Sequence, residues 1–482
     1  MNEKTYIARR MRTESPSHSI FLHPSHVGER YVPSPGGGHL VSGDRAMSWC
    51  AAGRVRRTGR MFPAPLFLQC RRLAAGGRAS DDLLELCRRR CFLLGEKATP
   101  ASVLGGRHSL GPLGAQMKRN LVKEWWDATV LHPEQVLPID SLCRLPGTSN
   151  PSPRPLPKAR LDRLQNQSPT QEELEKMADL RQDLLYGALY YYPSCLELLN
   201  RKLPFGIAEV GRCFHPISDE EDPDTCRAGE GTAASLVWFS SAKTCAQWRD
   251  YWLRQRLLWW RKFAQVPSRF SIGDHPDEDG TKTTLIQYDF PWGKEPIERL
   301  GSLDDSALAQ MHHGPIADLH GRDGRKSAIP HVVWMSSDVG GGLLAYLCDA
   351  LQVTESAAPR GKEQRRTVLK IHPSLAPVTL AVDLGKGPAA DLRLVCQGLC
   401  TELRGRGISV WPGYLETLHT PMEQLFTRYD EMGVLFTALV SDVTLESGLL
   451  QLRSRDTTIK ETVHVSKLGA FLTQHMTAEA KR

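Results

Sequence analysis

Apolar residues recur at helical spacing from about Ser80 onward. SDDLLELCRRRCFLL (80–94) begins with a serine that can cap a helix, and its leucines lie three or four residues apart. LGPLGAQMKRNLVKEWWDATV (110–130) predicts a second, amphipathic helix. The residues expected to share its buried face are Met117, Leu121, Trp125 and Ala128. EQVLPID (134–140) predicts a strand that a proline ends, so a folded region is predicted from residue 81 to 145.

A proline-rich stretch then interrupts the pattern. PGTSNPSPRPLPK (146–158) is typical of a linker, and helical sequence resumes at Ser168 with a capping pattern and continues to about Tyr192. Strand patterns return after it, so residues 146–199 are predicted to be a linker and a helical insertion.

Strands and helices alternate through residues 200–355. FGIAEVGRCFHPI, GTAASLVWFS, TTLIQYDF and IPHVVWM predict strands, and AKTCAQWRDYWLRQRLLWWRKFA (242–264) and GLLAYLCDALQ (342–352) predict helices. Four tryptophans of the first helix fall on neighbouring apolar stripes, so they are predicted to lie in the core: Trp248, Trp252, Trp259 and Trp260. Residues 81–145 and 200–355 are therefore predicted to form one core domain.

The C-terminal third changes character. TESAAPRGKEQRR (354–366) is charged and rich in breakers, which predicts a linker. Beyond it, strands near VTLAVDL, ISVWPG and VLFTALVS alternate with helices, and a hairpin and a closing helix end the chain. Residues 356–482 are predicted to be a separate α/β domain.

The first 80 residues differ in charge from the rest. No Asp or Glu occurs between Arg45 and Ser80, whereas arginine is frequent there. This acid-poor, basic composition predicts a mitochondrial presequence, and Met47 or Met61 could be the working start. A disordered tail without a targeting role is the alternative.

Overall composition narrows the classes of function. The net charge of +7 over 482 residues favours an anionic partner. The 12 cysteines include no C-x-x-C pair, so we predict scattered thiols in a reducing compartment and no metal. The absence of a long apolar run argues against a transmembrane helix and a membrane partner.

An ordered set of segments resembles the class II aminoacyl-tRNA synthetases, specifically the glycyl branch. GPLGAQMKRNLVKEWW, IAEVGRCFHPI, SLVWFSSAKTCAQWRDYWLRQRLLWW and IPHVVWMSSDVGGGLLAYL lie where that family has its motifs and the elements around them. LAPVTLAVDL and the segments after it resemble the anticodon-binding domain. The resemblance implies an α+β fold, with an antiparallel sheet core, a helical insertion and a C-terminal anticodon-binding-like α/β domain.

The charged groups that such enzymes use are missing. Where the resemblance implies an ATP-clamping arginine in the second motif, this chain has His215. In the third motif, Trp334 stands in place of an acid and Gly341 in place of an arginine. Glycine cannot neutralise a phosphate, and histidine cannot mimic a two-pronged guanidinium. We therefore expect no catalytic residue, no cofactor and no aminoacylation.

A synthetase scaffold with these losses and a basic leader resembles the accessory subunits of mitochondrial DNA polymerases. EWW, CFHP, LVWF, LHGRDGRK, ISVWPGYLET and LRSRDTT carry this resemblance. It implies a non-catalytic homodimer of the mitochondrial matrix nucleoid that binds the catalytic polymerase subunit and double-stranded DNA and raises processivity. A divergent mitochondrial glycyl-tRNA synthetase and a tRNA-binding synthetase paralogue are the alternatives.

Two sets of residues are candidates for these contacts. Cations in the glycine-rich loop HGRDGRK and in the tryptophan-rich helix could meet DNA phosphates without reading bases: Arg322, Arg325, Lys326, Arg256, Arg261 and Lys262. A solvated face or a surface ion pair is the alternative for each arginine. Aromatic and basic residues of the C-terminal domain are candidates for binding the catalytic subunit: Trp411, Tyr414, Leu449, Arg453 and Arg455. Trp411 could instead close the core.

Overall fold

The computed structural model describes residues 77–95, 98–133, 135–143, 181–218, 226–276, 282–312, 314–357, 363–416 and 421–480. Residues 1–76 of the predicted presequence and residues 146–180 of the predicted insertion lie outside these ranges. The first described helix, α1 (Gly77–Arg89), begins close to where the hydrophobic pattern places the start of ordered sequence.

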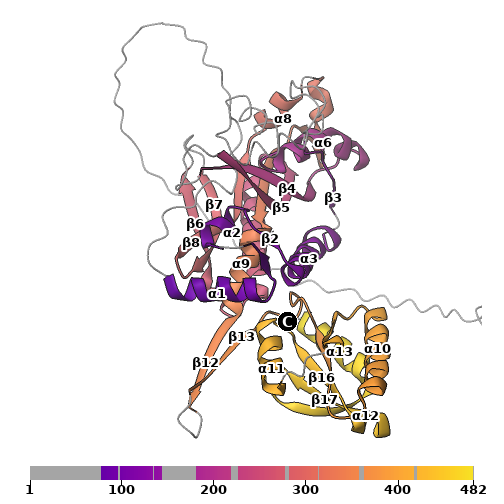
Figure 1. Cartoon of the computed structure of the whole chain (residues 1–482). Coiled ribbons are helices and arrows are strands. Elements are labelled where there is room, and N and C mark those ends of the chain that lie inside the picture. Colours follow the sequence, from indigo (N-terminus) through magenta and orange to yellow (C-terminus); the bar gives the residue numbers. More distant parts are fainter. Residues whose placement is uncertain are drawn as a thin grey trace, which may run out of the picture. The chain divides into compact units, whose positions relative to one another are not determined.

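The predicted core region is built around one seven-stranded sheet (Figure 1). Its strand order is β3-β4-β5-β11-β8-β7-β6, and every neighbouring pair is antiparallel except β3 and β4. The strands are β3 (Val136–Pro138), β4 (Phe205–Ser218), β5 (Cys226–Ser240), β6 (Phe270–Pro276), β7 (Lys282–Phe290), β8 (Gly293–Leu303) and β11 (His331–Asp338).

Helices cover both faces of this sheet. α3 (Pro112–Trp126), α7 (Cys245–Lys262) and α9 (Val339–Ala350) pack with α1 on the face that carries Ala208, Leu236 and Met335. α6 (Leu185–Leu198) and α8 (Ser306–Met311) pack on the opposite face, over Ile207, Val237 and Trp334. The remaining small elements of this region are β1 (Leu93–Leu94), α2 (Pro100–Leu104), β2 (Ser109–Leu110), η5 (Pro267–Arg269), η6 (Ile316–Leu319), β9 (Gly321–Asp323) and β10 (Lys326–Ala328).

The helix predicted over residues 110–130 changes type near its end. Met117, Leu121 and Trp125 are buried as predicted, but Ala128 is exposed and Thr129 is buried. Residues Asp127–Leu131 form the π-helix η4, whose wider turn accommodates an extra residue. The next buried position therefore moves from residue 128 to residue 129.

The segment predicted as a linker over residues 354–366 is largely a two-stranded ribbon. β12 (Leu351–Ala357) pairs antiparallel with β13 (Glu363–Leu369), from Leu351 opposite Leu369 to Ala357 opposite Glu363. The charged residues suggested a breaker-rich linker, but the pairing satisfies the backbone along both arms, and β-branched residues such as Val353 and Val368 favour it.

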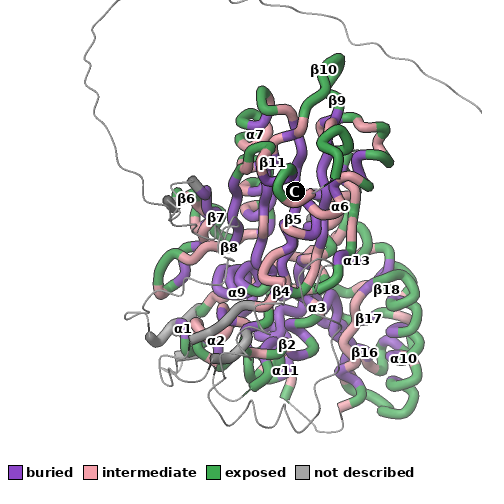
Figure 2. Tube along the Cα trace, turned by 90° about the horizontal axis from the view of Figure 1, so that it is seen from above, coloured by how far each residue is buried: buried purple, intermediate pink, exposed green. Residues whose placement is uncertain are grey.

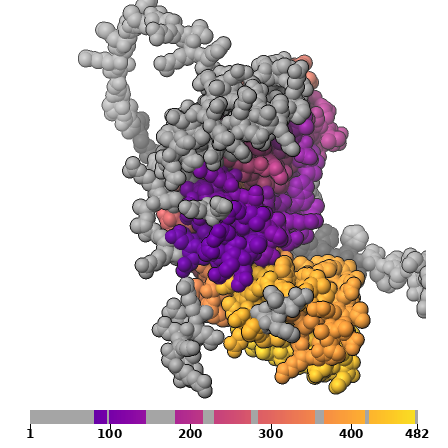
Figure 3. Space-filling view, in the orientation of Figure 1, coloured from indigo at the N-terminus to yellow at the C-terminus, as the bar shows by residue number. Residues whose placement is uncertain are grey.

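The C-terminal residues form a five-stranded mixed sheet with the order β15-β14-β16-β17-β18. β14 pairs parallel with β15 and β16, and β17 and β18 add an antiparallel hairpin. Figure 3 shows these residues, from orange to yellow, as a continuous packed body. Its elements are β14 (Leu380–Leu384), α10 (Ala389–Gly405), β15 (Val410–Pro412), η7 (Gly413–Leu415), α11 (Met422–Glu431), β16 (Phe436–Val440), α12 (Asp442–Ser447), β17 (Leu449–Ser454), β18 (Lys460–His464) and α13 (Val465–Ala480).

Candidate functional site

The predicted glycine-rich loop is a short exposed hairpin. β9 and β10 pair so that Lys326 lies opposite Asp323 and Ser327 opposite Arg322. Gly324 makes the turn with φ +62°, a conformation that glycine adopts without steric cost. Residues 322–328 are all exposed, and Figure 2 shows the hairpin in green. The structure thus gathers the three predicted cations of this loop, Arg322, Arg325 and Lys326, on one solvent-facing turn.

The hairpin is tied at its base to the segment between α6 and β4. The backbone N–H of Arg322 donates to the carbonyl of Arg201 at 2.6 Å, and the N–H of Leu203 donates to the carbonyl of Arg322 at 2.9 Å. These bonds bring Arg201 and Lys202 beside the hairpin, so two more cations join the three that the sequence indicated.

Arg256 does not lie on this basic surface. It is 3 % exposed, and its Nε donates to Glu298 Oε1 at 2.8 Å. Its guanidinium also lies over the rings of Trp125 and Trp259. This corrects the expectation that Arg256 contacts DNA, because a buried and paired guanidinium cannot reach a phosphate.

The two other cations predicted on α7 have different surroundings. Arg261 is half-buried and donates through Nε and Nη2 to the carbonyl of Phe270 at 3.1 and 2.7 Å. Lys262 is exposed, with its Nζ 3.9 Å from Glu124 Oε2. Lys262 is therefore the member of this group that the structure leaves most accessible.

The tryptophans of α7 lie in the core, as the hydrophobic pattern predicts. Trp252, Trp259 and Trp260 are buried, and the half-buried Trp248 packs against the same core. The indole N–H of Trp260 donates to Glu298, so the acid that pairs with Arg256 is also held by this helix.

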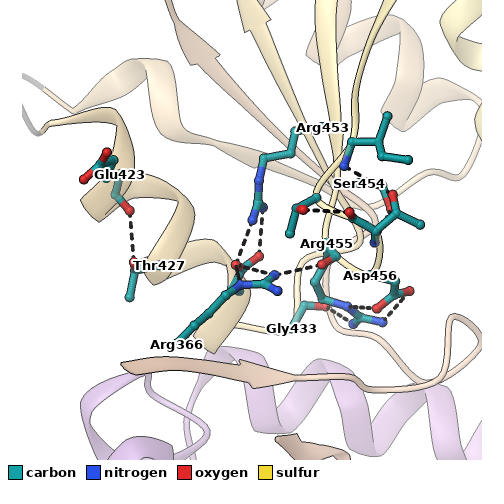
Figure 4. Close-up of polar contacts among 12 residues, drawn as sticks. Arg366, Glu423, Thr427, Gly433, Arg453, Ser454, Arg455 and Asp456 are labelled. Atoms are coloured by element: carbon teal, nitrogen blue, oxygen red, sulfur yellow. Dashed lines mark hydrogen bonds and ion pairs between the residues drawn. The ribbon is translucent and has the colours of Figure 1, made fainter. Parts of the chain in front are cut away.

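Three of the five candidate partner-binding residues are structural. Tyr414 is 7 % exposed, Arg453 is 6 % exposed and Arg455 is 2 % exposed. Arg453 binds Asp430 through both terminal nitrogens at 2.9 Å, and Arg455 donates to the carbonyls of Gly433 and Ile371. Figure 4 shows Arg453, Arg455 and Gly433 within this group. These placements correct the expectation that the three side chains face a partner.

The other two candidates keep more exposure. Leu449 is 36 % exposed at the start of β17. Trp411 is half-buried on β15 and packs against the core, which matches the alternative considered for it. The partner-binding set predicted from the sequence is thus reduced to Leu449 and the accessible part of Trp411.

The positions compared with an ATP site lie on β4, β11 and α9. Trp334 is 6 % exposed, and its ring lies so close to Gly301 that a Cβ atom there would approach it to 2.6 Å. Gly341 lies in the first turn of α9, which Asp338 caps by accepting from the N–H of Gly340 at 2.9 Å. His215 is on β4 opposite Gly229, and its side chain lies outside the described residues.

Burial makes Asp338 unlike an ordinary carboxylate. Desolvation raises its pKa to about 6, although the backbone N–H groups of Gly341 and Gly340 and the nearby Lys118 oppose the shift. Lys118 donates to Thr232 Oγ1 at 2.5 Å.

Comparison with known proteins adds a second line of evidence. Residues 379–475 match the model of the family described as an anticodon binding domain. The chain is 56 % identical to DNA polymerase subunit gamma-2, mitochondrial, of Xenopus laevis, over 85 % of this chain and 90 % of that protein. The chain belongs to the DNA polymerase subunit gamma-2 family. The gamma-2 subunit of Bos taurus is 50 % identical over 84 % of the chain and 87 % of its own length.

More distant relatives of this gamma-2 family member are synthetases. The glycine–tRNA ligase of Thermobifida fusca is 25 % identical over 84 % of this chain and 99 % of that enzyme. Both resemblances stated from the sequence are confirmed, and the much higher identity to gamma-2 subunits supports the accessory-subunit interpretation over the synthetase alternative.

Sequence reasoning missed one polar cluster of this gamma-2 chain. Glu209, 2 % exposed on β4, accepts from the N–H and hydroxyl of Ser141 and from Arg181 Nη1 at 2.7 Å. Arg181 also donates to the carbonyl of Arg212 at 2.7 Å. The signal in the sequence was an acid within the apolar strand FGIAEVG. A buried acid needs a partner, so this residue indicated a polar cluster.

Two findings bear on metals and membranes. Within the ranges that the structure describes, no group of three or more His, Cys, Asp or Glu side chains could hold a metal ion. No helix among the same residues is sufficiently long and apolar to cross a bilayer.

Proposed function

We propose that this chain is a non-catalytic subunit that binds the catalytic subunit of mitochondrial DNA polymerase and duplex DNA, and that it raises processivity. The observation that carries the proposal is the 56 % identity to a mitochondrial gamma-2 subunit over 85 % of the chain. That relative's name and the acid-poor leader also support a mitochondrial localisation. We propose that the chain lies in the nucleoid of the mitochondrial matrix.

Processivity requires a slow release of DNA. A subunit linked to the polymerase that also contacts the duplex makes rebinding intramolecular, so the complex stays on the template longer. The exposed cations of the β9–β10 hairpin provide a surface for phosphates without base recognition, and Lys262 on α7 is a separate exposed cation. Arg256 has no part in this surface.

Binding of the catalytic subunit is assigned to the C-terminal domain. Leu449 offers an exposed apolar side chain at the edge of the β17–β18 hairpin. Arg453, Arg455 and Tyr414 would act indirectly, by holding the domain's shape beneath that surface. We also propose that the chain is a homodimer, to which the insertion over residues 146–199 and the core sheet would contribute.

The ancestral ATP site is proposed to be lost. Trp334 fills space against Gly301, and Gly341 offers no cation. An ATP–pyrophosphate exchange assay with glycine tests this directly. We expect no exchange above background, and measurable exchange would restore the synthetase alternative.

Primer extension tests the main proposal. Product lengths made by the catalytic subunit would be compared with and without this protein across a salt titration. We expect longer products with the protein, and an advantage that declines at high salt because phosphate contacts are screened. Unchanged lengths at every salt concentration would refute the proposal, and tRNA outcompeting duplex DNA would favour the paralogue alternative.

A further inference from the structure

A shallow pocket of ≈ 490 Å³ lies at the base of the β9–β10 hairpin. It is lined by Arg201, Ile316, Ala317, His320, Arg322 and Ser327. These residues come from the α6–β4 connection, from η6 and the residue after it, and from both strands of the hairpin.

One wall of the pocket is a fixed cation. The Arg201 guanidinium donates to Glu197 Oε1 at 2.7 Å and to the carbonyl of Ala317 at 2.8 Å, and it lies 3.7 Å from Asp318 Oδ1. Its backbone has φ +59°, following φ +52° at Asn200. Because the side chain is oriented before any ligand arrives, little side-chain entropy is lost on binding.

Arg322 also lines the pocket, and its charge is not neutralised. It is exposed, and among the described residues no carboxylate lies within ion-pair distance of its side chain. His320 adds an imidazole, and Lys202 follows Arg201 directly. The hairpin tip adds Arg325 and Lys326, so positive charge exceeds the negative charge of the neighbouring acids, which are Glu197, Asp318 and Asp323.

We propose that this pocket binds a phosphate group of a nucleotide, held between Arg201 and Arg322, with Ser327 donating a hydroxyl and the apolar Ile316–Ala317 wall beside the sugar. The inference deepens the proposed function and rests on it. The same chemistry would serve a backbone phosphate of bound DNA or the phosphates of a free nucleotide. Contacts between guanidinium groups and phosphate are charge-assisted and among the stronger hydrogen bonds in proteins.

Ser327 permits a test that changes charge with little change in size. It is exposed and lies opposite Arg322 in the hairpin, so substitutions there should not affect folding. Ser327→Glu places a carboxylate in the pocket, and Ser327→Gln is the neutral control. Binding of a fluorescent duplex, followed by anisotropy across a salt series, should be about tenfold weaker for Ser327→Glu than for Ser327→Gln, the equivalent of one charged hydrogen bond.

A second pair of variants removes a cation instead of adding an acid. Arg322→Ala should weaken duplex binding and lower the slope of log affinity against log salt by about 0.9, the value for one phosphate contact. Arg393→Ala removes an exposed arginine from α10 and should change neither quantity. The pocket would be overturned if Ser327→Glu and Ser327→Gln bound duplex equally well and Arg322→Ala had the same slope of log affinity against log salt as the unaltered protein. The proposed function would then still stand.

Calorimetric titration with dATP distinguishes the two sources of phosphate. Binding of dATP by the unaltered protein, abolished in Ser327→Glu, assigns the pocket to free nucleotides. No dATP binding, together with the charge-sensitive duplex binding, assigns it to the DNA backbone. Failure of the unaltered protein to bind duplex at low salt would instead refute the proposed function itself.

Discussion

Two groups of basic residues in this molecule have opposite surroundings. Arg322, Arg325 and Lys326 protrude from a glycine turn and are exposed, whereas Arg453 and Arg455 are 6 % and 2 % exposed within the C-terminal domain. Both groups looked alike in the sequence, as clusters of charge beside turns. The difference shows that a basic cluster can equally be a binding surface or an internal brace, depending on whether acids and carbonyls converge on it.

Asp430 is the centre of the buried group. It is 1 % exposed and accepts from Arg453 at 2.9 Å and from Arg366, on β13, at 2.8 and 3.0 Å. Its neighbour Glu431 pairs with Arg89, the last residue of α1, and with Arg90, which follows it. The end of α11 therefore joins segments that are far apart in the sequence.

The largest loss of stability is expected for Asp430→Asn. Removing this charge leaves Arg453 buried without its ion pair and weakens the bonds to Arg366, which costs about 3–5 kcal/mol for a buried pair that loses one partner. Urea denaturation would measure the free energy of unfolding. Glu446→Gln, at an exposed acid of α12, is the control and should stay within about 0.5 kcal/mol of the parent. Equal stability of the two variants would show that the buried group is not a brace.

Arg256→Met should have the next largest effect. It leaves the Glu298 carboxylate buried, with the indole N–H of Trp260 still donating to it, so we expect a loss of about 3 kcal/mol. Adding Glu298→Gln should recover part of that loss, because the uncompensated charge is removed. The folded variant should bind duplex DNA with the same affinity as the parent. A weaker affinity with unchanged stability would show that Arg256 contacts DNA.

Asp338→Asn concerns a buried acid that is served mainly by backbone N–H groups. Burial raises the pKa of Asp338 to about 6 from an ordinary value of 3.8. The native state therefore holds this proton more tightly than the unfolded state, and the group's contribution to stability falls as pH rises from about 4 to about 6. Asparagine can still cap α9.

We accordingly expect Asp338→Asn to be more stable than the parent at pH 7, with the advantage disappearing below about pH 4. The measurement is the difference in free energy of unfolding between the two proteins at several pH values. A difference that does not vary with pH would contradict the titration of Asp338.

The smallest effect on stability is expected for the exposed cations of the β9–β10 hairpin. Replacing Arg322, Arg325 and Lys326 together by alanine should change the free energy of unfolding by less than about 0.5 kcal/mol per site. The same variant should lower the salt dependence of duplex binding by up to about 0.9 for each DNA phosphate that the protein no longer neutralises. A large loss of stability with unchanged DNA binding would show that the exposed cations stabilise the fold and do not bind DNA.

Hydrophobic spacing predicted most elements because each buries one apolar face. The strands β4, β5, β7 and β11 and the helices α9, α10 and α11 lie close to where their patterns place them. β8 was missed because GKEPIERLGSL reads as polar, and its Glu298 is buried by pairing with Arg256 and Trp260 that no local pattern reveals. Arg256 was misplaced for the same reason, since it continues the buried stripe from Trp252 to Trp260 only because Glu298 neutralises it.

The candidate surfaces were predicted unevenly. The β9–β10 hairpin could be found because a glycine turn fixes its residues in solvent. The roles of Arg453 and Arg455 depend on carbonyls and acids 22 or more residues away, such as Asp430 and Ile371, and only the folded chain brings these together. Arg201 joined the pocket for a similar reason, through a bridge to the hairpin.

The contact between Trp334 and Gly301 has a consequence for how this chain can change over generations. The indole occupies the space that any side chain at residue 301 would need, and a smaller residue at 334 would leave a void there. Neither position can mutate alone without harm. Descendants should therefore keep both residues or exchange the two together.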